Sequence, residues 1–186
     1  MCFPVTITTG IENTLIGGLA GDALTDADYN VGVGVSALSS DTLGSRNTAI
    51  GTFTLQTQNF TTATDSYNTA VGYNSGSAVT TGSGNTLVGG LSGDALTVGE
   101  SNAVLGFNAL TVDTKGNKST AIGAGALSAQ NFTTATDSYN TAVGFEAGDQ
   151  VTTGTLNTLI GGLAGDALTS GNSNVAIGYQ ALTSDT

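Results

Sequence analysis

Residues 47–51 read Asn-Thr-Ala-Ile-Gly, and this pentad decides the fold because it returns along the whole chain. Pentads of the general form Asn-Thr-x-Ile/Val-Gly begin at residues 13, 30, 47, 68, 85, 102, 119, 140, 157 and 174. Successive pentads start 17 positions apart, except for two intervals of 21. Self-similarity at a short fixed period is the signature of a repeat architecture. Ten units therefore fill the 186-residue chain as a single repeat domain, residues 1–186, and the units that begin at 47 and 119 carry four-residue insertions.

A longer period lies above the first, and we call it the long repeat. It comprises four units, three of regular length and one with an insertion, as from the pentad at 13 to the pentad at 85. The segment from Gln58 to Gly72 (QNFTTATDSYNTAVG) returns unchanged one long repeat later, from Gln130 to Gly144. The two units with insertions are therefore copies of each other. We number the positions of each unit from 1, at the first residue of its pentad.

The composition favours strands over helices. Thr, Val, Ile and Tyr between frequent glycines are typical of short strands joined by tight turns, and the strong helix formers are scarce. We predict an all-β fold, a parallel β-solenoid or β-roll of about ten 17-residue rungs, each with two short strands and two turns. Stacked rungs place Asn on Asn, and ten of them make a rod of about 48 Å at the usual strand spacing. One rung buries too little apolar surface to be stable without its neighbours.

Position 4 is aliphatic in every unit, and we interpret this column as the inward-facing core. Its members are Ile16, Val33, Ile50, Val71, Val88, Leu105, Ile122, Val143, Ile160 and Ile177. A 17-residue rung encloses little more than one such row. We therefore expect a second apolar row, formed by Leu15, Leu87 and Leu159, to be covered by another chain. A trimer is the favoured assembly, and a self-sufficient monomer is the alternative.

Position 5 is glycine in all ten units, which indicates a backbone with positive φ or a very close approach of two chains. These turn glycines are Gly17, Gly34, Gly51, Gly72, Gly89, Gly106, Gly123, Gly144, Gly161 and Gly178.

The charge balance excludes several classes of function. The net charge is −11, and Arg46, Lys115 and Lys118 are the only cations, so nucleic-acid binding is not expected. No apolar run approaches the length of a membrane span, so we predict no membrane insertion. Cys2 is the only cysteine and allows no intrachain disulfide. Histidine is absent and the carboxylates fall at turn positions, so we predict no enzyme, no catalytic residue and no cofactor.

The pentads Ser119–Gly123 and Asn174–Gly178 resemble the repeats of trimeric autotransporter adhesin heads, which are parallel β-rolls of three chains. The stretch Gly178-Tyr-Gln-Ala-Leu182 resembles the arrays of phage tail fibres more closely. The resemblance implies the non-enzymatic shaft or head of a homotrimeric attachment fibre on a virion or cell surface. A phage tail fibre is the first expectation, and a bacterial adhesin or extracellular filament subunit is the second. Since Thr186 falls at position 13 of its unit, we expect a segment of a longer fibre.

The insertion loops, residues 56–67 and 128–139, are the candidate binding sites, because aromatic side chains beside polar groups suit a cell-surface glycan or another host receptor. The candidate residues are Phe60, Asp65, Tyr67, Phe132, Asp137 and Tyr139. The alternative is that these aromatic side chains cover the flank of the roll or fill a groove between chains.

Two further ideas are weaker. Asp22, Asp94 and Asp166 lie in Gly-Gly-x-x-Gly-Asp-x-Leu stretches that resemble a calcium-binding nonapeptide, but the motif does not recur in adjacent turns, and solvated turn aspartates are the favoured interpretation. A monomeric ice-binding solenoid is the third function considered. The threonines at position 2 share the parity of position 4, however, so we expect them to point inward.

The aromatic residues at position 6 are interpreted as packing residues. They are Tyr73, Phe107, Phe145 and Tyr179.

Overall fold

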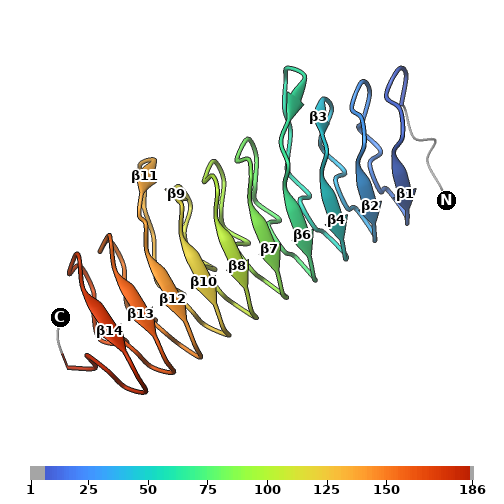
Figure 1. Cartoon of the computed structure of the whole chain (residues 1–186). Helices are drawn as coiled ribbons and strands as arrows, with labels where there is room; N and C mark the ends of the chain where they lie inside the picture. Colours follow the sequence, from blue (N-terminus) through green and yellow to red (C-terminus); the bar gives the residue numbers. More distant parts are fainter. Residues whose placement is uncertain (1–6, 185–186) are drawn as a thin grey trace.

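The computed structural model describes residues 7–184, so Cys2 and Thr186 lie outside the described residues. These residues form ten stacked coils without any helix, and every strand pairing is parallel (Figure 1). The predicted all-β parallel solenoid of about ten rungs is therefore confirmed.

One strand from each rung joins a ten-stranded sheet in chain order. Its strands are β1 (Thr14–Ile16), β2 (Val31–Val33), β4 (Thr48–Ile50), β6 (Thr69–Val71), β7 (Thr86–Val88), β8 (Ala103–Leu105), β10 (Thr120–Ile122), β12 (Thr141–Val143), β13 (Thr158–Ile160) and β14 (Val175–Ile177). The register pairs equal unit positions even across an insertion, as for Ile50 and Val71.

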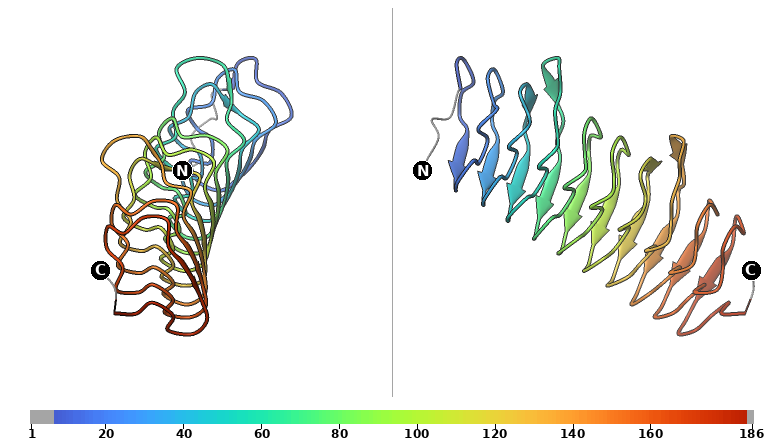
Figure 2. Two further views of the ribbon diagram at one scale, coloured as in Figure 1. Left: turned by 60° about the vertical axis from the view of Figure 1, so that its left-hand side comes forward. Right: turned by 180° about the vertical axis from the view of Figure 1, so that it is seen from behind.

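The insertions add two small sheets. Strand β3 (Gly44–Ser45) pairs with β5 (Thr64–Asp65), and β9 (Gly116–Asn117) pairs with β11 (Thr136–Asp137). The loops that carry β5 and β11 project beyond the neighbouring coils, on the side opposite the strand tips of the ten-stranded sheet (Figures 1 and 2). The expected second strand in every rung is wrong: most of each rung consists of turns, because left-handed residues recur at positions 7, 9 and 17.

A ladder of buried asparagines at position 1 connects the rungs. The Oδ1 atom of Asn85 accepts the backbone N–H of Asn102 at 3.0 Å, and its Nδ2 atom donates to the carbonyl of Gly99 at 2.8 Å. The same two bonds occur at Asn30, Asn68 and Asn157 with their own neighbours. Each of these asparagines thus joins its rung to the next and closes its own turn, which confirms the stacking of Asn on Asn.

Ser119 is the exception in this column, and Ser138 compensates for it. The hydroxyls of Ser119 and Ser138 lie 2.7 Å apart, and Ser138 accepts the backbone N–H of Asn140 at 3.3 Å. In the copy one long repeat earlier, Asn47 accepts the corresponding N–H of Asn68 directly. A serine pair therefore replaces one asparagine without breaking the ladder.

The core belongs to the single chain, and the predicted core column is wrong. Position 3 points inward, so that Leu87 and Leu159 are fully buried, whereas Ile16 and Ile177 at position 4 are 60% and 67% exposed. Positions 3 and 9 share the same part of the interior. Where position 3 is leucine, position 9 is glycine, and a Cβ at Gly93 would lie 2.9 Å from the side chain of Leu87. The leucine row expected to need a second chain is thus covered within its own rung.

The other residues at position 4 also point outward. Ile50, Leu105, Ile122 and Ile160 are exposed, and Val33, Val71, Val88 and Val143 are half-buried.

The glycine column at position 5 combines the two features that the sequence indicates. Gly51 and Gly72 have φ values of 131° and 134°, and a Cβ on either would lie 2.5 Å from the carbonyl oxygen of the glycine in the next rung. A side chain at this position would force the rungs apart, so glycine is required by both conformation and space.

We predict that Asn85→Ala lowers the midpoint of thermal unfolding. The substitution leaves the N–H of Asn102 and the carbonyl of Gly99 unpaired in the interior, at a cost of about 1–3 kcal/mol for each group. Ser119→Asn is the matched control, because Asn47 fills the same environment four rungs away, and its midpoint should equal or exceed that of the wild type. A midpoint for Asn85→Ala equal to that of the wild type would contradict the role of the ladder.

Candidate functional site

The outer surface of the ten-stranded sheet, formed by positions 2 and 4 of every rung, is here called the apolar face. It carries aliphatic side chains at position 4 and mainly threonines at position 2. No charged residue occurs at positions 1–6 of any unit, although the chain has a net charge of −11. The apolar face is therefore an uncharged strip along one side of an acidic rod, and such continuous exposed apolar surface is typical of an interaction site.

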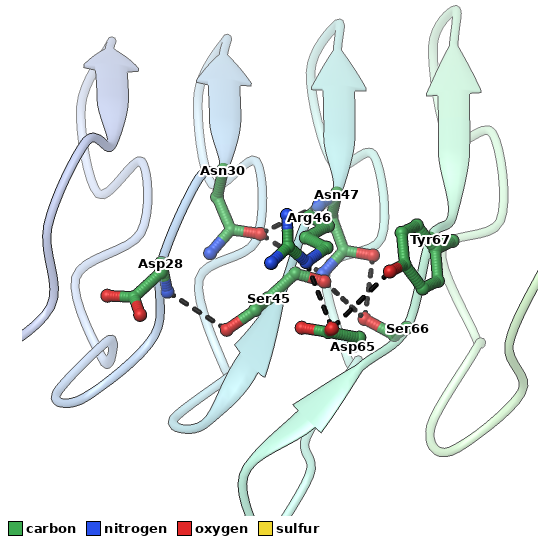
Figure 3. Close-up of polar contacts among 8 residues, drawn as sticks. All are labelled: Asp28, Asn30, Ser45, Arg46, Asn47, Asp65, Ser66 and Tyr67. Atoms are coloured by element: carbon green, nitrogen blue, oxygen red, sulfur yellow. Dashed lines mark hydrogen bonds and ion pairs between the residues drawn. The ribbon is translucent and has the colours of Figure 1, made fainter.

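A polar cluster lies at the corner before this face, where the first insertion loop returns to the sheet (Figure 3). Nε of Arg46 lies 2.9 Å from Oδ2 of Asp65, and the guanidinium lies 4.7 Å and 5.9 Å from the ring centroids of Tyr29 and Tyr67. The hydrogen bond with Asp65 raises the pKa of Arg46. Tyr67 itself is 59% exposed. The cation thus bridges three consecutive rungs at their left-handed corner residues.

The second insertion repeats this cluster with lysine in place of arginine. Nζ of Lys118 lies 2.5 Å from Oδ2 of Asp137 and 3.2 Å from the hydroxyl of Tyr139. The hydrogen bonds from Lys118 and then from Asn117 lower the pKa of Asp137, and the bond with Asp137 raises the pKa of Lys118. The two clusters are four rungs, or about 19 Å, apart along the rod.

The other aromatic candidates, Phe60 and Phe132, do not belong to an exposed site. They are only 7% and 6% exposed, and their backbone N–H groups donate to the buried carboxylates of Asp41 and Asp113. Their predicted role in binding is wrong, because their rings anchor the start of each loop to the body of the rod. Of the candidate residues, the structure brings together only Asp65 with Tyr67 and Asp137 with Tyr139.

A buried polar network holds each anchor. Oδ2 of Asp41 accepts from Nε2 of Gln58 at 2.5 Å, and Oε1 of Gln58 accepts from Nδ2 of Asn68 at 2.8 Å. Gln130 makes the same two contacts, with Asp113 and Asn140. Among the described residues, position 12 is Asp or Gln at each insertion and in the rung before it, and is leucine or valine in the other rungs. The asparagine ladder completes the network through Asn68 and Asn140.

The aspartates of the calcium-like motif lie far apart. Asp22, Asp94 and Asp166 follow one another at intervals of four rungs, and Oδ1 of Asp94 accepts a hydrogen bond from Thr111 at 2.7 Å. Within residues 7–184, no group of three His, Cys, Asp or Glu side chains could hold a metal ion. The positions of these three aspartates do not allow them to share one ion.

The chain matches no family model, no curated protein and no solved structure. In the part of the chain that the structure describes, no helix could cross a membrane. The class of protein is therefore defined only by the fold and its surfaces. It is a tandem-repeat β-solenoid with a long apolar face and two equivalent polar clusters.

Arg46 and Lys118 are the site residues that the sequence reasoning did not identify. A signal was present, since they are two of only three cations and occupy equivalent places one long repeat apart. Their contacts with Tyr67 and Tyr139 could not be predicted, because these contacts depend on where each inserted loop rejoins the rod.

We predict that Lys118→Met raises the pKa of Asp137 toward its ordinary value, since the hydrogen bond from Lys118 is the largest cause of the lowering. A lowered pKa in the folded state stabilises the fold above the unfolded-state pKa, and this contribution is lost as the pH falls through the folded-state value. An NMR titration of the Asp137 carboxyl group measures the change. Lys115→Met is the control with equal loss of charge, and an equal shift in both variants would contradict the assignment.

Proposed function

We propose that this chain is a non-enzymatic structural segment of a homotrimeric attachment fibre, and that the apolar face packs against the other two chains. A phage tail fibre that contacts a host surface is the first choice, and a bacterial surface adhesin or extracellular filament subunit is the second. The location would be a virion or a cell surface. The observation that carries the proposal is the uncharged apolar face on an otherwise acidic rod.

The energetics favour a permanent partner for this face. Exposed isoleucines such as Ile16, Ile50 and Ile177 gain about 25 cal/mol for each Å² of apolar surface that association removes from water. No charge on the face would have to be desolvated, because all acidic side chains lie outside positions 1–6 of the units. With ten rungs in one column, small gains add along the whole rod.

The symmetry of a fibre selects the arrangement. Copies that lead from an anchor to a tip must run in the same direction, so their rotation axis lies along the rod. The resemblance of Ser119–Gly123 and Asn174–Gly178 to trimeric head repeats favours three chains around that axis. The flanks with Tyr67 and Tyr139 would then be available for contacts with a host surface.

We predict a particle of three chains for the wild type by light scattering. The double variant Ile50→Asp and Ile122→Asp should dissociate it, because the outward carboxylates would repel their copies and lose solvation at the interface. Circular dichroism checks that the variant keeps its β structure.

Val112→Asp is the matched control for this experiment. Val112 is 42% exposed at position 11, away from the apolar face, and its substitution introduces the same chemical change. Three chains should persist in this control. A monomeric or dimeric wild type, or equal dissociation of both variants, would refute the proposed trimer.

One observation supports ice binding, the third candidate. The threonines of position 2 share the outward orientation of position 4, so the inward orientation expected from parity with a core is wrong. Thr69 and Thr86 therefore lie on a regular, uncharged sheet surface with the valines of the same strands. The threonines of position 13 are engaged elsewhere, as when Oγ1 of Thr97 donates to the carbonyl of Thr114.

If ice binding is the function, the wild type should show thermal hysteresis as a monomer. The double variant Thr86→Lys and Thr120→Lys should abolish it, because long charged side chains disrupt a flat surface, whereas Val112→Lys should retain it. Absence of hysteresis in the wild type would reject this candidate.

A further inference from the structure

Position 6 carries a row of exposed aromatic side chains with regular spacing. Tyr73, Phe107, Phe145 and Tyr179 are 57%, 59%, 58% and 73% exposed. They occupy alternate rungs, and the rungs between them have glycine or alanine at the same position. The pitch of the row is therefore two rungs, or about 10 Å, and its four rings span about 29 Å along the rod. The packing interpretation holds in part, since the ring of Tyr73 packs edge-on against Phe53 with the centroids 6.2 Å apart, but all four residues remain more than half exposed.

The small residues between the rings have a clear spatial role. A Cβ at Gly90 would lie 3.5 Å from the ring of Phe107, and one at Gly162 would lie 3.6 Å from the ring of Tyr179. Each of these rings thus extends over the glycine of the preceding rung, and the row keeps one ring for every two rungs. Position 6 follows the glycine that ends each strand, so the row borders the apolar face instead of lying within it.

A side chain that can form hydrogen bonds directly follows each ring. These residues are Asn74, Asn108, Glu146 and Gln180, whereas the intervening rungs have Leu91, Gly125 and Leu163 at this position. Among the described residues, the first four side chains make no hydrogen bond within the protein. Polar groups therefore recur with the same two-rung pitch as the rings.

From this arrangement we infer that the aromatic row, Tyr73, Phe107, Phe145 and Tyr179, binds an extended, uncharged β-1,4-linked polysaccharide aligned with the rod. In such a chain, alternate sugar rings present the same face, and one disaccharide has about the length of two rungs. The C–H groups of a sugar face are attracted to the electron-rich face of an aromatic ring. The neighbouring amides and Glu146 are placed to bond the sugar hydroxyls.

The charge of the chain selects a neutral glycan over a polyanionic one. The net charge is −11, the row itself contains no cation, and Glu146 directly follows one of its rings. Four weak contacts in register on one rigid rod bind cooperatively, because the first contact places the next sugars at their rings. The inference rests on the proposed attachment function for its biological role, but it does not depend on the number of chains.

The test is sedimentation of the full chain with microcrystalline cellulose and with chitin, with granular starch as the α-1,4-linked control. The wild type should bind at least one of the two β-1,4-linked polymers and not starch. Phe107→Ala with Phe145→Ala should raise the dissociation constant by roughly tenfold or more, since two of four contacts are lost. The matched control is Val112→Ala with Leu156→Ala, which shortens two exposed apolar side chains outside the row and should bind like the wild type.

A second variant tests the pitch itself. Phe107→Ala with Ala124→Phe keeps four aromatic residues but moves one ring to the next rung, which leaves gaps of three rungs and one rung. We expect weaker binding than that of the wild type, although the number of rings is unchanged. Equal binding would show that spacing has no role and would overturn the inference.

Light scattering of the same samples separates this inference from the proposed assembly. A trimer that fails to bind cellulose and chitin would refute the aromatic row as a glycan site and leave the fibre proposal in place. A monomer that binds cellulose or chitin would support the aromatic row as a glycan site and refute the proposed trimer. If the Phe107 and Phe145 substitutions change the number of chains, the row is part of an interface between copies, and the inference is wrong.

Discussion

The hydrogen bonds of the buried asparagine ladder are the interaction on which the rest of this structure depends. Most of these asparagines accept the backbone N–H of the next rung and donate to their own turn, as Asn85 does for Asn102 and Gly99. This double role sets both the distance between rungs and their alignment. Once one column is in register, every other position is in register too, so a single unit motif becomes a continuous row along the rod. The surfaces described above are consequences of this alignment.

The insertions are tolerated because the interior compensates for them locally. An inserted loop leaves backbone N–H groups inside the rod, and these need acceptors when no water is present. The carboxylate of Asp41 accepts the backbone N–H of Phe60 in one copy, and that of Asp113 accepts the backbone N–H of Phe132 in the other. Gln58 and Gln130 donate to the same carboxylates. The buried carboxylates receive hydrogen bonds only from neutral donors. Because both copies contain the same network, the long repeat is visible in the core as well as on the surface. Each inserted loop therefore occurs together with the buried residues that anchor it.

The exterior of the rod is divided by chemistry. One face is aliphatic and uncharged, its border carries alternate aromatic rings, and the remaining flanks carry the acids and both cation clusters. A rigid scaffold allows these surfaces to act separately, since a contact at one rung leaves the geometry of the others unchanged. Repetition also converts weak local contacts into strong binding when the partner is itself periodic or is another copy of the chain.

The sequence by itself determined the period, the number of rungs, the asparagine ladder and the glycine column, because stacking requires the same residue at the same position. It did not reveal which way each strand faces. Positions 3 and 4 are both apolar, so alternation within three residues allows either orientation. Only the tertiary structure decided, because it turns position 3 inward, where Leu87 packs beside Gly93, and position 4 outward, where Ile16 and Ile50 are exposed. The pairing of Arg46 with Asp65 likewise depended on the path of an inserted loop, which no local pattern encodes.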